Sequence, residues 1–130
     1  MEKKTIRVGK ISDAIDKGKV PLSAAVRAGD FVFVSGLPPI DQKTGELVRG
    51  DVVKQAEVVL ENVKAALEAA GSSLDKVVKV TVFITNAAYF NRVNEVYARY
   101  FPQNPPARTT IQAARLPMDI RVEIDLIVLA

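Results

Sequence analysis

The sequence contains no cysteine and no histidine, and these two absences exclude most familiar catalytic designs. Without cysteine there is no disulfide, no thiol nucleophile and no zinc–thiolate centre. Without histidine the chain lacks the usual general base, the usual metal ligand and every histidine-dependent triad. Any catalysis must therefore rely on Glu, Asp, Lys, Arg, Tyr, Ser or Thr side chains, on backbone groups and on water.

The chain also lacks a long apolar run, because none approaches the ~18 residues of a membrane span. Its first residues lead into an alternating pattern, which predicts no signal peptide and a cytoplasmic protein without membrane contact. With 130 residues, of which 48% are hydrophobic and 25% charged, the composition predicts one folded domain over residues 1–130.

The net charge of +3 comes from one end of the chain. Residues 1–19 hold six basic and three acidic side chains, whereas the other 111 residues hold twelve of each. The excess is therefore confined to a terminal segment and does not form a continuous face that could follow phosphates. Nucleic-acid binding is not expected as the main role.

The hydrophobic pattern predicts an α+β fold with a mainly antiparallel or mixed sheet and two helices packed on one face. Asp51 is the expected N-cap of a helix that ends at Gly71, and a second helix is expected over residues 87–101. Residues 9–24 and 36–50 are expected to be loops. The expected strands cover residues 5–8, 25–27, 31–35, 77–85, 107–113 and 120–129, with Val78, Val80, Val82 and Ile84 on one side of the fourth.

Two strands carry apolar residues on both faces, which predicts that the second face of the sheet must also be shielded from water. Phe31-Val32-Phe33-Val34 and residues 124–129 carry apolar groups in alternate directions, whereas two helices can cover only one face. Self-association is the simplest source of cover. The alternative is that the N-terminal loop folds over the second face.

Arg108 and Glu123 are the strongest candidates for chemistry. Arg108 points to the same side of its strand as Thr110, and the preceding Pro105-Pro106 stiffens the approach, so the guanidinium could bind a carboxylate with two hydrogen bonds. A structural ion pair or a place at a subunit seam is the alternative for this arginine.

Glu123 lies mid-strand and is either on a solvated face or half-buried with a displaced pKa, ready to hold or deprotonate a water molecule. Arg108 on an adjacent strand, of the same or a neighbouring subunit, would favour the second interpretation, with both groups in one crevice. Ser35 is not expected to be a nucleophile because no base is evident to activate it, whereas Gly36 allows close approach. Asn94, Tyr97 and Tyr100 on the second helix are expected to be core or rim residues rather than catalytic ones.

Several short motifs occur in an order and at a spacing that resemble the RidA/YjgF family, from Ala25 to the C-terminus. The motifs are Val34-Ser35-Gly36, Lys43-Thr44-Gly45-Glu46, Leu60-Glu61-Asn62-Val63-Lys64, Asn94-Glu95-Val96-Tyr97, Pro106-Ala107-Arg108, Ala114-Arg115-Leu116-Pro117 and Val122-Glu123-Ile124.

This resemblance implies a chorismate-mutase-like fold assembled as a barrel-like homotrimer with clefts between subunits. It also implies hydrolysis of reactive 2-imino or enamine acids, such as 2-iminobutanoate and 2-iminopropanoate, to 2-oxo acids and ammonia. Arg108 would bind the substrate carboxylate and Glu123 would position or activate water. The residues implied to line the cleft are Ser35, Gly36, Asn94 and Thr110. The resemblance implies no metal and no other cofactor.

The chain departs from this family in residues 1–24 and at Thr110, where many relatives carry cysteine. Relatives often have Gly-Pro-Tyr before the first core strand, whereas Val20-Pro21-Leu22-Ser23 stands here, so that Leu22 replaces a tyrosine that reaches the cleft. The lost hydroxyl leaves open a second interpretation, a non-catalytic trimer that binds small carboxylates. A third is an RNA-directed inhibitor of translation, a description also attached to the family.

Overall fold

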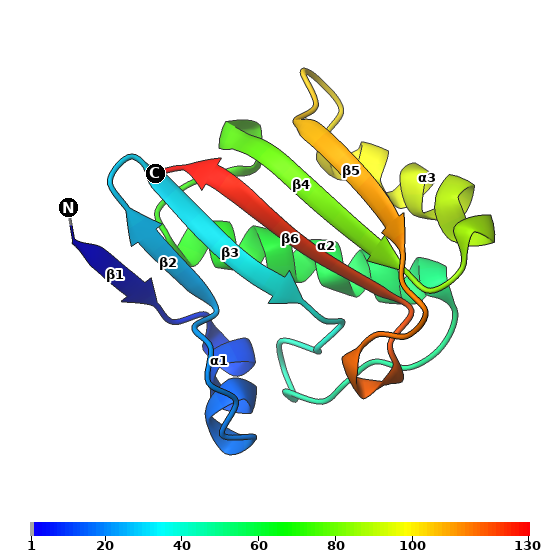
Figure 1. Cartoon of the computed structure of the whole chain (residues 1–130), viewed down its shortest axis with the longest axis horizontal. Helices are drawn as coiled ribbons and strands as arrows, with labels where there is room; N and C mark the ends of the chain where they lie inside the picture. The colour runs from blue at the N-terminus through cyan, green and yellow to red at the C-terminus, as the bar shows by residue number, and fades with distance from the viewer. Residues whose placement is uncertain (1) are drawn as a thin grey trace.

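The computed structural model describes residues 2–130, which form a six-stranded sheet with helices packed behind it (Figure 1). The strands are β1 (Lys3–Ile6), β2 (Ala25–Ala28), β3 (Phe31–Leu37), β4 (Val77–Ile84), β5 (Ala107–Gln112) and β6 (Val122–Leu129). The helices are α1 (Gly9–Lys17), α2 (Val52–Ala69) and α3 (Phe90–Tyr100), with short 3-10 helices η1 (Leu74–Lys76), η2 (Ala87–Tyr89) and η3 (Pro117–Asp119).

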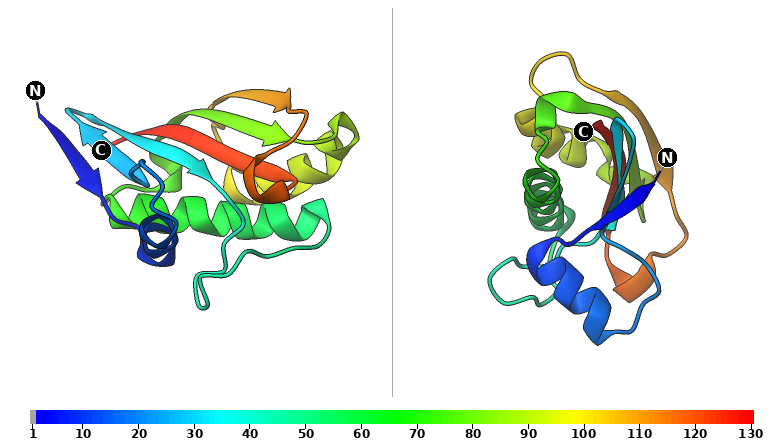
Figure 2. Two further views of the ribbon diagram at one scale, coloured as in Figure 1. Left: turned by 60° about the horizontal axis from the view of Figure 1, so that its bottom comes forward. Right: turned by 90° about the vertical axis from the view of Figure 1, so that its left-hand side faces the viewer.

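The sheet is mixed, as predicted, and its strand order is β1-β2-β3-β6-β4-β5. β4 and β5 run parallel, and every other neighbouring pair runs antiparallel. The edge-on view in Figure 2 shows α2 and α3 on the same side of the sheet, which confirms the predicted α+β arrangement. Among the helices within residues 2–130, none is both long and apolar enough to cross a membrane.

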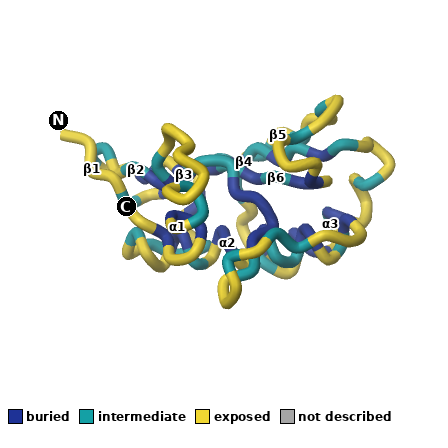
Figure 3. Tube along the Cα trace, turned by 90° about the horizontal axis from the view of Figure 1, so that it is seen from below, coloured by how far each residue is buried: buried dark blue, intermediate teal, exposed yellow. Residues whose placement is uncertain are grey.

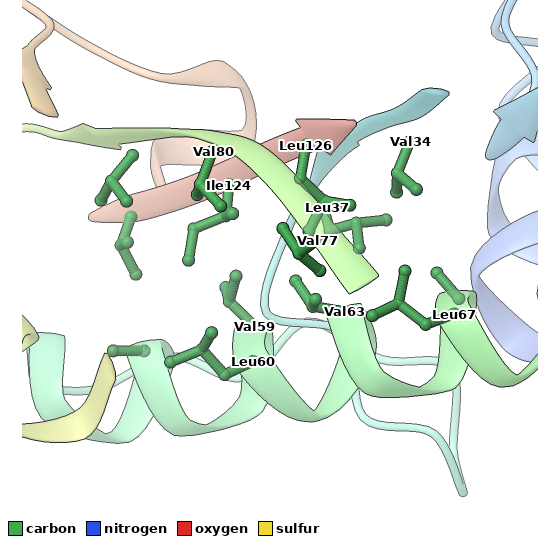
Figure 4. Packing of buried hydrophobic residues seen from close by; sticks show 14 of the residues in the cluster. Val34, Leu37, Val59, Leu60, Val63, Leu67, Val77, Val80, Ile124 and Leu126 are labelled. Atoms are coloured by element: carbon green, nitrogen blue, oxygen red, sulfur yellow. The ribbon is translucent and has the colours of Figure 1, made fainter. Parts of the chain in front are cut away.

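The hydrophobic core lies between α2 and the central strands. Figure 4 shows the α2 side chains of Val59, Leu60, Val63 and Leu67 facing Val80, Ile124 and Leu126 of the sheet. Full burial of such a side chain contributes about 1.5–3 kcal/mol. Buried residues recur along α2, α3 and the central strands, whereas β1 is largely exposed (Figure 3).

The boundaries of α2 follow its local sequence signals, and both predicted ends are confirmed. The Asp51 carboxylate accepts a hydrogen bond from the backbone N–H of Lys54 at 3.1 Å, as an N-cap residue does. Gly71 follows the helix with φ of 74°, the left-handed conformation that a side chain disfavours.

The predicted loop over residues 9–24 is wrong in its first half, where α1 forms. Ile11 is buried, and the hydroxyl of Ser12 accepts a hydrogen bond from the N–H of Val8 at 2.7 Å. Val8, expected at the end of a strand, is therefore buried before the helix, and β1 ends at Ile6. A helix of nine residues is marginal on its own, so tertiary burial rather than local propensity stabilises α1.

Two further details of the expected pattern are wrong. A bulge between Val77 and Lys79 turns Val78 outward, so Val78 does not share the buried side of β4 with Val80. The second helix, expected from residue 87, begins with the 3-10 turn η2, and the α-helix α3 itself starts at Phe90.

The second face of the sheet carries exposed apolar side chains, as predicted. Phe31 pairs with Leu129 in the register between β3 and β6, and Phe31, Phe33 and Leu129 remain 41%, 45% and 43% exposed. The N-terminal segment does not cover these residues. Self-association through this face stays a prediction.

Asn62 of α2 fixes the loop that follows β3. Its side chain is buried, and its amide nitrogen donates to the carbonyl oxygens of Pro38 at 2.8 Å and Ile40 at 2.9 Å. Its oxygen accepts a hydrogen bond from the side chain of Gln42. One buried amide therefore satisfies two backbone carbonyls at the place where the chain leaves the sheet.

We expect Asn62→Leu to lower the free energy of unfolding by about 2–5 kcal/mol, because it leaves two buried carbonyls without donors. Urea denaturation measures this change. The matched control is Asn91→Leu at an exposed position of α3, expected to change stability by less than about 0.5 kcal/mol. Equal unfolding midpoints for the two variants would contradict the anchoring role of Asn62.

Candidate functional site

Arg108 lies on β5, the last strand in the sheet order, and points toward α3. Its Nε–H donates to the hydroxyl of Thr110 at 2.9 Å, and its terminal NH2 group donates to Asn94 Oδ1 at 2.5 Å. The guanidinium carbon lies 4.5 Å from the ring centre of Tyr97 and 5.5 Å from that of Phe90. The structure thus brings together three of the predicted site residues.

The groups that contact the guanidinium of Arg108 are neutral, so they position its positive charge without neutralising it. None of the ion pairs found within residues 2–130 involves this arginine. Burial lowers the pKa of Arg108, while Tyr97 acts in the opposite direction, and an arginine remains charged at neutral pH. Its two hydrogen bonds leave further N–H groups of the guanidinium free to donate to an anion.

The ring of Tyr97 packs against the guanidinium of Arg108. Its ring packs against Phe101 with the ring centres 4.7 Å apart. Among the described residues no group bonds its buried hydroxyl, and burial raises the pKa of Tyr97 to about 12 despite the opposing effect of Arg108. The phenol is therefore neutral at physiological pH and serves as an aromatic platform, in agreement with the expected core position.

Glu123 lies on β6 directly over Gly36 of β3. A side chain at position 36 would place its Cβ atom 2.8 Å from the carboxyl carbon of Glu123, too close for a real contact. Glycine is therefore required at position 36 for the carboxylate to lie where it does. The close approach at Gly36 is therefore made by the Glu123 side chain, and a role of Gly36 in substrate binding stays a prediction.

The hydroxyl of Ser35 has a structural partner. It donates to the carbonyl oxygen of Ser23 at 2.6 Å, and the backbone N–H of Ser35 donates to Ala24 at 3.0 Å. These bonds join β3 to the segment before β2. The hydroxyl of Ser35 is therefore engaged in a structural hydrogen bond.

A cavity of about 300 Å³ opens beside Glu123. Ser35, Gly36 and Leu22 line it together with Glu123, so Leu22 faces this space. Burial raises the pKa of Glu123, and the negative charge of Asp125 on the same strand raises it further. A carboxyl group in this setting keeps its proton to a higher pH than an exposed one does.

The structure corrects the expectation that Arg108 and Glu123 lie on adjacent strands, because β4 separates β5 from β6 (Figure 1). Arg108 and Leu126 both pair with Val80, whereas Glu123 pairs with Phe83. An odd separation along β4 places the two side chains on opposite faces of the sheet. Arg108 faces the helices and Glu123 the open side, so the cavity beside Glu123 does not contain Arg108.

The turn η3 forms a cavity wall that the sequence pattern does not predict. Met118 and Asp119 have φ of 64° and 56°, and Arg49 donates to the carbonyl oxygens of both, at 2.9 and 3.5 Å. Pro117 and Met118 line the cavity. Aspartate tolerates the left-handed conformation, but methionine rarely adopts it and no glycine is present, so Asp119 is a weak sequence signal for this turn.

Within residues 2–130, no cluster of three or more acidic side chains is arranged to hold a metal ion. The charged groups of the candidate site are a half-buried guanidinium on one face of the sheet and a half-buried carboxyl group on the other.

Comparison with known proteins places this geometry in a family. The family model described as Endoribonuclease L-PSP matches residues 13–130. A solved structure from Thermotoga maritima is 54% identical, with a TM-score of 0.81, over 85% of this chain and 87% of that chain. Escherichia coli TdcF with bound serine is 42% identical, with a TM-score of 0.79, over 85% and 88% of the two chains. Reactive Intermediate Deaminase A of Arabidopsis thaliana is 42% identical over 82% of this chain and 57% of its own length.

We expect Gly36→Ala to displace the Glu123 carboxylate while leaving the fold intact. The obstructing atoms belong to the flexible end of a side chain, so the loss in unfolding free energy should stay below about 1 kcal/mol. Once moved toward solvent, Glu123 should titrate at a lower pH than in the wild type. A carbon-13 NMR titration of its carboxyl group measures this shift, and an unchanged titration would contradict the proposed contact.

The raised pKa of Glu123 also predicts a pH dependence of stability. Between the ordinary glutamate pKa of ~4.3 and the raised value, the folded state holds more protons than the unfolded state, so stability falls as pH rises. Glu123→Gln cannot ionise, so its stability relative to the wild type should increase through this window and stay constant above it. Urea unfolding at a series of pH values tests this, and a pH-independent difference would refute it.

Proposed function

The chain belongs to the RidA/YjgF family, and we propose that it hydrolyses reactive 2-imino and enamine acids in the cytoplasm. The proposed substrates include 2-iminobutanoate and 2-iminopropanoate, and the products are 2-oxo acids and ammonia. The observation that carries this proposal is the half-buried, unneutralised guanidinium of Arg108, held by Asn94 and Thr110 with donors to spare.

Arg108 is the proposed carboxylate-binding residue. Each charge-assisted hydrogen bond to such a group is worth about 1.5–3 kcal/mol, and a planar guanidinium can form two at once. The TdcF structure supports a small ligand of this kind, since serine carries a carboxylate. The name of the Arabidopsis relative supports the reaction class.

Glu123 is the proposed proton-transfer residue. As a carboxylate it accepts a proton from water while the water oxygen bonds to the carbon of the protonated imine, which gives a neutral carbinolamine. That proton then moves to the amine nitrogen. The carbon–nitrogen bond breaks as the hydroxyl group loses its proton to Glu123 and becomes the carbonyl of the 2-oxo acid, and the departing ammonia takes this proton from Glu123. A positioned acid–base group contributes about 10²–10⁴-fold, and the raised pKa of Glu123 suits this role.

The two halves of this site come from different copies of the chain in our proposal. Arg108 and Glu123 lie on opposite faces of one sheet, so one face must meet a different surface of a neighbour. Contacts between unlike surfaces close into rings, and a homotrimer is the ring we propose. The exposed Phe31 and Phe33 give the open face an apolar area to bury in such an assembly.

We expect Arg108→Ala to lose at least about 10²-fold in kcat/KM, because two charge-assisted hydrogen bonds to the substrate disappear. The assay measures release of ammonia and 2-oxobutanoate from freshly generated 2-iminobutanoate. Arg99→Ala is the matched control, since Arg99 pairs with Glu57 at an exposed position of α3. Full activity in Arg108→Ala would reject the proposed role.

A second candidate is a non-catalytic trimer that binds small carboxylates. Leu22 favours it, because an apolar side chain faces the cavity where related sequences offer a hydroxyl. One experiment distinguishes the two candidate functions. Binding of 2-oxobutanoate by the wild type, without any acceleration of imine hydrolysis, would favour the binding protein over the deaminase.

A further inference from the structure

The cavity beside Glu123 has walls that its proposed chemistry does not require. Apolar side chains from α1, from the segment before β2 and from η3 converge on it, and we call this space the apolar chamber. The side chains that define the chamber are Ile11, Ile15, Val20, Leu22 and Met118. Val20, Leu22 and Met118 are 46%, 48% and 52% exposed, so apolar surface remains open to a ligand there.

The chamber has few polar groups. Glu123 is the charged residue in its lining, and the hydroxyl of Ser35 already donates to the carbonyl of Ser23 at 2.6 Å. A ligand that enters this space therefore meets apolar walls with one carboxyl group at the side. A hydroxylated or charged substituent would lose its hydration there without gaining partners in return.

We infer that the apolar chamber receives the side chain of the 2-imino acid and selects substrates with leucine-sized or methionine-sized apolar side chains. This inference rests on the proposed function. In that function Arg108 of a neighbouring copy binds the substrate carboxylate, and Glu123 lies beside the imine carbon. The remaining substituent of the imine carbon, which is the amino-acid side chain, then extends into the chamber.

The size of the chamber supports this assignment. Its volume of about 300 Å³ equals the space of about ten water molecules at ~30 Å³ each. A methyl or hydroxymethyl side chain would leave most of that space unfilled. Each additional buried methylene should strengthen binding by about fourfold.

Leu22 and Val20 are the residues that we expect to set this preference. Both lie in the stretch between α1 and β2, so neither belongs to a strand of the sheet. Their exposed side chains form the wall that a tyrosine would make polar. They are specificity-determining residues in this inference and take no part in proton transfer.

The test compares the binding of pyruvate and 4-methyl-2-oxopentanoate by titration calorimetry. Both 2-oxo acids are stable, carry the same carboxylate and differ only in their apolar side chain, so no turnover is needed. We expect the wild type to bind 4-methyl-2-oxopentanoate more tightly by a factor on the order of 50.

Leu22→Asn replaces an apolar side chain with a polar one of similar size and should reduce this preference about tenfold, with pyruvate binding unchanged. Val20→Thr adds one hydroxyl to the same wall and should reduce the preference by a smaller factor. Val78→Thr makes the identical change at an exposed position on β4, outside the chamber, and should leave both dissociation constants unchanged.

Equal affinity of the wild type for the two acids would overturn the inference, as would a preference that survives both Leu22→Asn and Val20→Thr. Imine assays separate this outcome from failure of the proposed function. A preference for 4-methyl-2-oxopentanoate without acceleration of any imine hydrolysis would reject the deaminase function and support the role of the chamber. Equally fast hydrolysis of alanine-derived and leucine-derived imines would support the deaminase function and reject the role of the chamber.

Discussion

The packing of α2 and α3 on one face of the sheet is the constraint on which the rest of the structure depends. It commits alternate residues of every central strand to the core and leaves the other half on the open face. Arg108 falls on the helix side and Glu123 on the open side, although few residues separate β5 from β6. A site that uses both groups is therefore a property of an assembly, and the uncovered Phe31 and Phe33 give that assembly a surface.

The two charged groups are held in complementary ways. Aromatic rings and neutral oxygens surround Arg108, while desolvation and the like charge of Asp125 act on Glu123. Each group is half-buried without an opposite charge from the described part of its own chain, an arrangement that costs free energy in the isolated subunit. A substrate carboxylate beside the arginine and a proton on the glutamate would lower these free-energy costs. The same half-buried charges that destabilise the isolated subunit are therefore the groups proposed for function.

The sequence predicted the parts of the fold that local signals specify. α2 was predictable because its apolar repeat is long and because Asp51 and Gly71 mark its ends. α1 was not, since nine residues carry too short a repeat and the burial of Ile11 decides the outcome. The identities of Arg108 and Glu123 could be proposed from motifs, but their opposite orientation could not. It depends on β6 entering the sheet between β3 and β4, a pairing between distant parts of the chain.

The division between strands and loops gives the site two parts that can change separately. The groups proposed for chemistry stand on β5 and β6, where sheet hydrogen bonds fix their directions. The chamber walls come from α1, the segment around Leu22 and the left-handed turn at Met118, which Arg49 holds through two carbonyl oxygens. A substitution in these walls alters the space offered to a ligand without moving a strand. Such a fold can therefore keep one reaction while its substrate preference changes, because loops tolerate replacement better than paired strands do.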